Sequence, residues 1–168
     1  SMVERVAELR KQTGFDVVHA HDWMTIPSGL AISAFLDKPL TVTFHSTEFG
    51  RSLGAFTSES YTIEGIESSG AVEASRIVVA SRAMMEEVCG RFNVPQDKVR
   101  VIPNAIDVQA PRLTIDPAKV REQLGISTSD RVVLCVGRLT PQKGMELLIQ
   151  ATPEILAQHP EAKIVIVG

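Results

Sequence analysis

The chain has 168 residues, 44% of them hydrophobic, and a formal net charge of −3, a composition typical of soluble globular proteins. This weak acidity disfavours nucleic acid and acidic membranes as partners. The apolar runs are far shorter than the roughly 20 residues of a membrane span, and residues 1–20 show no basic region followed by an apolar one, the pattern of a secretion signal. We therefore expect a cytoplasmic protein in which Cys89 and Cys135 are free thiols.

Helical and strand patterns alternate through the first hundred residues. Short apolar runs indicate strands, and apolar residues spaced by three and four indicate helices. Ser81 can cap a helix whose stripe of Met85, Val88, Cys89 and Phe92 indicates core packing. The predicted elements are helix 3–13, strand 16–20, a helix ending at Leu36, strand 40–46, loop 47–59, helix 61–74, strand 76–81, helix 82–91 and strand 99–102.

The predicted loop 47–59 is unusually long. It contains Gly, Ser and Thr residues without a steady period. Connections in α/β units usually have about 2 to 6 residues. Its length therefore indicates a functional loop.

A proline-containing linker, 103–117, divides the pattern in two. It places a boundary near Asp107, so that residues 1–106 and 107–168 form separate domains. Both domains alternate apolar strands with helices, which indicates parallel sheets. The predicted fold class is α/β, with two doubly wound, Rossmann-like units whose sheets carry helices on both faces. Ligands of such sheets bind beyond the carboxyl ends of the strands.

The second domain begins with a short helix that starts at Asp116 with Pro117 and ends at Gly125, and strand 132–136, a helix and strand 163–167 follow. No strand precedes the first helix of the chain, and the second domain stops at a strand. We interpret the sequence as an internal piece of a longer protein, with Ser1 either native or left by cloning. So small a second domain exposes apolar strands. We expect a second copy of the chain or the first domain to cover them.

A glycine and two cations follow the apolar strand of the second domain. Gly137 lets a ligand approach the backbone, Arg138 offers a planar fork of donors, and Lys143 adds a mobile charge where the next helix begins. The unpaired N–H groups of a helix N-terminus also favour anions. The pattern predicts a phosphate-binding turn, although a solvated turn before a surface helix has the same spacing.

Two histidines, His19 and His21, stand at the carboxyl end of strand 16–20. Alternate strand residues project from one face, so the pair could grip a divalent metal ion as amidohydrolases do. Their barrel needs eight strands and further ligands, whereas His159 lies in a turn far along the chain. A metal pair and a structural pair that satisfies buried backbone groups are both open at this point.

Four ordered motifs resemble those of the family 4 glycosyltransferases, retaining enzymes with the GT-B fold. GRLTPQKGMELLIQA resembles the G-R-x4-K-G-x3-L-I-x-A element, and HAHDW resembles the H-x-H-D-W element of glycogen and starch synthases. TFHSTEFGRS is similar to the T-x-H segment with an extended loop. VIPNAID matches the P-N-G-I-D linker motif except that Ala105 replaces glycine. The resemblance extends over residues 15–168.

The resemblance implies transfer of a sugar from a nucleoside diphosphate sugar, UDP- or ADP-linked, to a glucan or another hydroxyl acceptor. Arg138 and Lys143, at the turn of Gly137, would bind the donor diphosphate. His21 would be the catalytic contact to the transferred sugar. Family members need no metal for the diphosphate, so we expect neither a metal site nor a cofactor.

The resemblance also implies roles on the acceptor side. Asp22 would shape the loop beside the sugar, and Trp23 would pack against the protein. His45, Glu48 and Arg51 belong to the extended loop and are candidates for contact with the acceptor.

Two family elements have no counterpart in this sequence: the glycine-rich loop after the first strand and the E-x7-E element in the second half of the C-terminal domain. We therefore expect the 168-residue chain to be inactive alone. Two functions of other classes stay open: a metal-dependent hydrolase using His19 and His21, and a nucleotide-binding or interaction module without turnover. The sugar, the base and the acceptor are not specified by the sequence.

Overall fold

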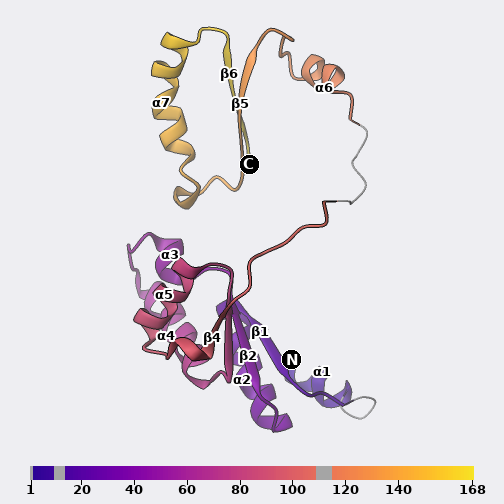
Figure 1. Ribbon diagram of the computed structural model, residues 1–168, viewed down its shortest axis with the longest axis vertical. Coiled ribbons are helices and arrows are strands. Elements are labelled where there is room, and N and C mark those ends of the chain that lie inside the picture. Colours follow the sequence, from indigo (N-terminus) through magenta and orange to yellow (C-terminus); the bar gives the residue numbers. More distant parts are fainter. Residues whose placement is uncertain (1, 10–13, 109–114) are drawn as a thin grey trace. The chain divides into compact units, whose positions relative to one another are not determined.

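The computed structural model describes residues 2–9, 14–108 and 115–168. The chain forms two compact units, Ser1–Ile106 and Asp107–Gly168 (Figure 1). Residues 10–13 of the predicted first helix and part of the predicted linker lie outside the described residues. The first unit contains α1 (Met2–Leu9), β1 (Val18–His21), α2 (Asp22–Leu36), β2 (Leu40–Phe44), α3 (Glu48–Ser52), α4 (Ser58–Glu73), β3 (Arg76–Val79), α5 (Arg82–Phe92) and β4 (Val99–Val101).

The first unit is built on a parallel sheet with the strand order β1-β2-β3-β4. Because each strand lies beside the next one in sequence, right-handed crossovers bring the connecting helices α2, α4 and α5 to the same face. One hydrophobic cluster joins these helices to the sheet. It contains Ile26 of α2, Ala71 of α4, Val88 of α5, and Ala20, Val42, Ile77 and Val99 from the four strands.

The other face of this sheet carries polar side chains. In β1 and β2 the apolar residues Ala20 and Val42 pair in register and join the core. Their neighbours alternate to the opposite face, where His21 pairs in register with Thr43. Strand alternation therefore places the histidines of β1 away from the helical layer.

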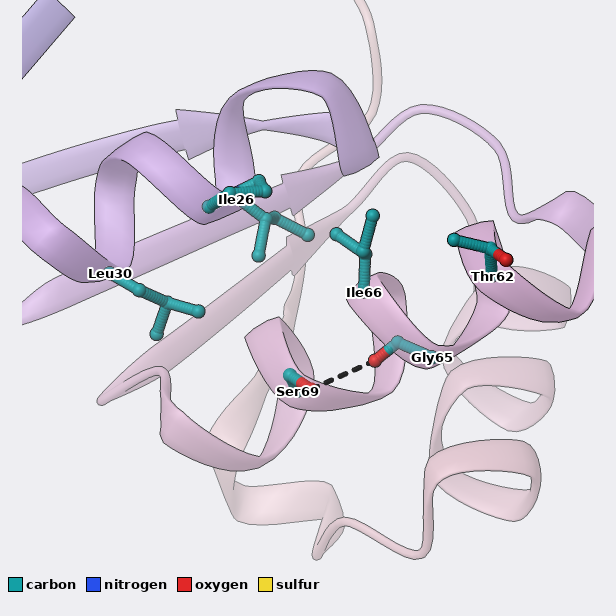
Figure 2. Close-up of a pocket in the computed structure, with 7 residues that line it drawn as sticks. Ile26, Leu30, Thr62, Gly65, Ile66 and Ser69 are labelled. Carbon is teal, nitrogen blue, oxygen red and sulfur yellow. Dashed lines mark hydrogen bonds between the residues drawn. The ribbon is translucent and has the colours of Figure 1, made fainter. Parts of the chain in front are cut away.

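Helices α2 and α4 approach closely at Gly70. The side chain of Ile26 occupies the space that a Cβ atom at this position would need, with Ile26 Cδ1 only 2.6 Å and Cγ2 2.7 Å away. An open pocket of about 300 Å³ lies beside this contact (Figure 2). Its lining includes Ile26 and Leu30 of α2 and Ile66 of α4, and Ser69 donates a 2.8 Å hydrogen bond to the carbonyl of Gly65.

Alanine substitutions should distinguish this contact from ordinary helix surface. Gly70→Ala should lower the free energy of unfolding by about 1 to 3 kcal/mol, because Ile26 must move to admit the methyl group. Gly65→Ala, on the same helix with no atom from outside this helix within 4 Å of its Cβ position, should raise it by roughly 0.5 to 1 kcal/mol. Urea unfolding followed by the fluorescence of Trp23, the only tryptophan, measures both. Equal stability of the two variants would mean that α2 moves freely.

The prediction that residues 47–59 form a loop without regular structure was wrong. It contains the short helix α3, and α4 begins at Ser58 rather than at Tyr61. The side chain of Thr47 caps α3 by accepting from the N–H of Gly50, and Thr57 caps α4 by accepting from Ser60. A five-residue helix has little stability of its own, so tertiary contacts decide its formation.

The second unit contains a parallel pair of strands. They are paired in register from Arg131↔Ala162 to Val136↔Val167. The first helix begins directly after Asp116, as predicted, and the side chain of Asp116 caps it by accepting from the N–H of Ala118. The elements are α6 (Pro117–Gln123), β5 (Arg131–Val136), the 3-10 turn η2 (Pro141–Lys143), α7 (Met145–Gln158) and β6 (Ala162–Val167).

Apolar side chains of the second unit are exposed. Leu134 and Val136 of β5 expose 61% and 68% of their surface. Between α6 and the strands lies an apolar pocket of about 310 Å³ that includes Ile115, Leu124 and Val165. That a second copy of the chain or the first domain covers these strands remains a prediction. In the described part of the chain, every helix is too short or too polar to cross a lipid bilayer.

Candidate functional site

Three imidazole rings meet at the carboxyl ends of β1 and β2. His21 ends β1, and His45 directly follows β2. Because the two parallel strands are neighbours, His21 Nδ1 and His45 Nε2 are 3.1 Å apart and share a hydrogen bond. Their rings are nearly parallel, with centroids 5.3 Å apart, and the His19 centroid is 4.3 Å from that of His21.

His19 is turned to a partner within the sheet. Its Nε2 lies 2.7 Å from the hydroxyl of buried Thr43. Burial lowers the pKa of His19 below its ordinary value, and the nearby rings of His21 and His45 lower this pKa further. The ring therefore resists protonation in the folded chain.

Acid should weaken the first unit through His19. Below the ordinary pKa of 6.5, the unfolded chain binds a proton that the folded chain resists. The free energy of unfolding should therefore be level above this pH and fall as the pH drops from it to the lowered pKa of the folded state. Urea unfolding at about pH 7.5 and about pH 5.5, read from Trp23, tests this. The free energy of unfolding should decrease less between these two pH values in His19→Gln than in the unsubstituted chain. An equal decrease in both would contradict the assignment to His19.

Asp22 ties the ends of the two strands together. It adopts a left-handed conformation with φ 54°, which is uncommon for a residue other than glycine. Its Oδ1 accepts a 2.7 Å hydrogen bond from the backbone N–H of His45. Thr25 Oγ1 accepts from His21 N–H at 2.6 Å and is 2.7 Å from His21 O. These bonds hold the backbone on both sides of the imidazole pair.

The three acceptor-side candidates differ in accessibility. His45 is exposed, whereas Glu48 is buried and Arg51 is half-buried. Arg51 Nη2 is 2.6 Å from Oε1 of Glu67, and Arg51 Nε is 3.1 Å from Oε2 of Glu48. Both charged groups of α3 are therefore engaged in pairing within the protein.

Sequence reasoning missed Glu67. The residue is fully buried on α4, with its side chain only 1% exposed. A signal was present, because Glu67 is four residues from the apolar Ile63 and four from Ala71, which places it on the core face of the helix. An acidic residue at such a position requires partners.

The predicted phosphate-binding residues lie on one turn of the second unit. Gly137 follows β5, its N–H donates to Val167 O at 2.9 Å, and a Cβ atom there would lie 3.8 Å from Cγ of Lys143. The stem of Lys143 therefore passes over Gly137. Arg138 and Lys143 are both exposed. Thr140 Oγ1 is buried without a hydrogen-bond partner among the described residues, so this turn is not fully satisfied by its own contacts.

The predicted residues thus form two groups, each within its own unit. One contains His19, His21 and His45, and the other contains Arg138 and Lys143. Within residues 2–9, 14–108 and 115–168, no three His, Cys, Asp or Glu side chains are arranged to hold a metal ion. The ring nitrogens described above face Thr43 and one another instead.

Comparison with known families decides the membership of the chain. The model described as Glycosyltransferase Family 4 matches residues 1–110, and the model described as Glycosyl transferases group 1 matches residues 116–168. The chain belongs to glycosyltransferase family 4. The family assignment agrees with the four motifs noted in the sequence.

Curated relatives of this family 4 chain are longer. An uncharacterised glycosyltransferase of Methanocaldococcus jannaschii is 37% identical over 170 residues, which cover 96% of this chain and 43% of the relative. A glycogen synthase of Mycobacterium tuberculosis is 32% identical over 154 residues, which cover 91% of this chain and 35% of the relative. The chain therefore spans about two fifths of the length of these proteins.

Solved structures share the fold of this family 4 chain. Anabaena HepE, in complex with UDP and glucose, has a TM-score of 0.75 and 24% identity, and the match covers 98% of this chain and 42% of HepE. Sucrose-phosphate synthase of Thermosynechococcus elongatus has a TM-score of 0.74 and 25% identity, and the match covers 99% of this chain and 40% of the synthase. The mixed α/β architecture with parallel sheets is that of GT-B glycosyltransferases.

Proposed function

We propose that the protein carrying this sequence transfers a sugar from a nucleoside diphosphate sugar to a hydroxyl acceptor with retention of the anomeric configuration. The observation that carries the proposal is the turn after β5, where two exposed cations, Arg138 and Lys143, follow Gly137. The solved complexes of HepE with UDP and with UDP-glucose support a donor of this class.

Charge stabilisation is the main contribution of the second unit to this reaction. As the glycosidic bond stretches, negative charge grows on the leaving diphosphate. Fixed cations at Arg138 and Lys143 stabilise that state more than the ground state, and this difference accelerates transfer. The guanidinium of Arg138 can bind two diphosphate oxygens at once, and the flexible ammonium of Lys143 can bind another.

The first unit contributes the contact to the transferred sugar. His21 is exposed, and its ring is held by His45 on one side and by the Thr25 contacts of its backbone. These contacts restrict the ring before the sugar binds, so a hydrogen bond to a sugar hydroxyl costs less conformational entropy. We assign the sugar contact to His21, and we assign His45 to the acceptor side.

We further propose that the acceptor is a glucan or another glycan, as the similarity to a glycogen synthase suggests. The two cations neutralise the diphosphate, so that no divalent metal is needed. Turnover should then persist after treatment with EDTA. A requirement for added metal would contradict this part of the proposal.

A donor panel tests the function. The sample is a protein of full family length, that is, one that contains this sequence and is as long as its family 4 relatives. It is incubated with UDP- and ADP-linked sugars and a glucan acceptor, and the released nucleotide and the anomeric configuration of the product are measured. We expect release with one donor and an unchanged anomeric configuration. The 168-residue chain serves as the comparison and should show no transfer. Release from none of the donors, or inversion at the anomeric carbon, would refute the proposal.

A further inference from the structure

A buried carboxylate lies behind the segment that follows His45. Glu67, on α4, is 0% exposed. Both of its oxygens accept from the backbone N–H of Glu48, at 3.0 and 2.9 Å, and Oε1 also accepts from Arg51 Nη2 at 2.6 Å. Burial raises the pKa of Glu67, and the hydrogen bonds from Glu48 and Arg51 act against this increase. A carboxylate in this place therefore depends on these donors.

Arg51 extends the contact from Glu67 to the backbone beside His45. Its Nη1 donates to the carbonyl and to the hydroxyl of Ser46, each at 3.0 Å, and its Nε donates to Glu48. Three nitrogens of one planar guanidinium thus bind three different residues. Because the plane is rigid, fixing it at Glu67 also fixes Ser46.

Ser46 directly follows His45, whose ring shares a hydrogen bond with His21. The N–H of His45 is held by Asp22, and the hydroxyl of Thr47 donates to a carboxylate oxygen of Glu87 on α5. Three consecutive residues are therefore held by three different elements. Of the carboxylates involved, Glu67 is the most deeply buried.

We propose that Glu67 is a positioning residue, which through Arg51 and the N–H of Glu48 fixes the segment 46–48 and so holds His45 against His21. The effect on transfer rests on the proposed function, whereas the effect on the imidazole pair does not. A merely structural role would lower stability without moving the rings. The two readings therefore differ in what happens at His45.

Glu67→Gln removes the charge while it keeps the shape of the side chain. Glu64→Gln is the matched control: Glu64 lies one turn away on α4 and forms a 2.5 Å ion pair with Arg91, whose guanidinium packs on the ring of Phe49 in α3. The control thus loosens α3 without touching the bonds of Ser46 or Glu48.

The first readout is the NMR spectrum of the histidine rings in the 168-residue chain, with His159 of the second unit as internal reference. In Glu67→Gln the signals of His21 and His45 should shift, and the cross-relaxation between their rings should weaken. In Glu64→Gln both should stay close to those of the unchanged chain. If Glu67→Gln does not fold, Arg51→Lys decides, because a single ammonium cannot reach Glu67 and Ser46 together.

The second readout is kinetic and uses the protein of full family length. Glu67→Gln should lower kcat about 10-fold or more, since small misplacements of binding groups have large effects on rate, and KM for the donor should stay unchanged. Ring signals that do not move, or moved signals with unchanged kcat, would overturn the proposal. Absence of transfer in the unsubstituted protein would refute the proposed function alone, because the ring signals still decide the role of Glu67.

Discussion

Replacing Arg138 or Lys143 by alanine should lower the turnover of the protein of full family length about 10²- to 10³-fold, as is found when one donor to a charged transition state is lost. Both side chains are exposed on the turn after β5, so folding should survive. The loss should appear in kcat, because charge on the diphosphate grows as the bond to the sugar breaks.

Arg131→Ala is the control for this experiment. Arg131 begins β5 and forms an exposed ion pair with Glu161, at 3.1 Å. An exposed pair of this kind contributes roughly 0 to 1 kcal/mol to stability, so the variant changes the net charge of the unit without touching the turn. If Arg138→Ala or Lys143→Ala keeps the kcat of the control with every donor, the assignment of these cations is wrong.

Alanine at His21 and alanine at His19 should have opposite consequences. His21→Ala should lower turnover about 10²-fold while the free energy of unfolding stays unchanged, because the hydrogen-bond partner of this ring, His45, is itself exposed. His19→Ala should leave activity per folded molecule nearly unchanged. It should lower the free energy of unfolding by about 1 to 3 kcal/mol, because buried Thr43 loses its partner.

Urea unfolding and initial rates measure the two effects in the same preparations. His159→Ala, in the second unit, controls for the loss of an imidazole as such. Equal destabilisation by His19→Ala and His21→Ala, with activity per folded molecule unchanged in both, would identify a purely structural pair.

The regular elements of the fold could be predicted because local signals determine them. Apolar runs located the strands, and Ser81 was correctly predicted to cap a helix, since it accepts from Met84 N–H. Val88 and Phe92 lie in the core as their spacing indicated. These signals are contained in a few neighbouring residues.

The segment after β2 could not be predicted because its structure depends on distant residues. Helix α3 is bonded to Glu67, which is 19 positions from Glu48 in the sequence. The left-handed φ of Asp22 likewise accompanies a bond to the backbone of His45, on the next strand. Periodicity contains no information on either contact. The face that carries His19 and His21 followed from strand alternation, but their different partners did not.

When both rings are neutral, the hydrogen bond between His21 Nδ1 and His45 Nε2 couples their tautomers. If His21 donates, its Nε2 is an acceptor and Nδ1 of His45 carries a hydrogen; if His45 donates, both outer atoms exchange these roles. In either case the neutral pair offers one donor and one acceptor. A sugar hydroxyl, which can donate and accept, can pair with either outer nitrogen in either tautomer, and the orientation of its own hydrogen then selects which ring donates to the other.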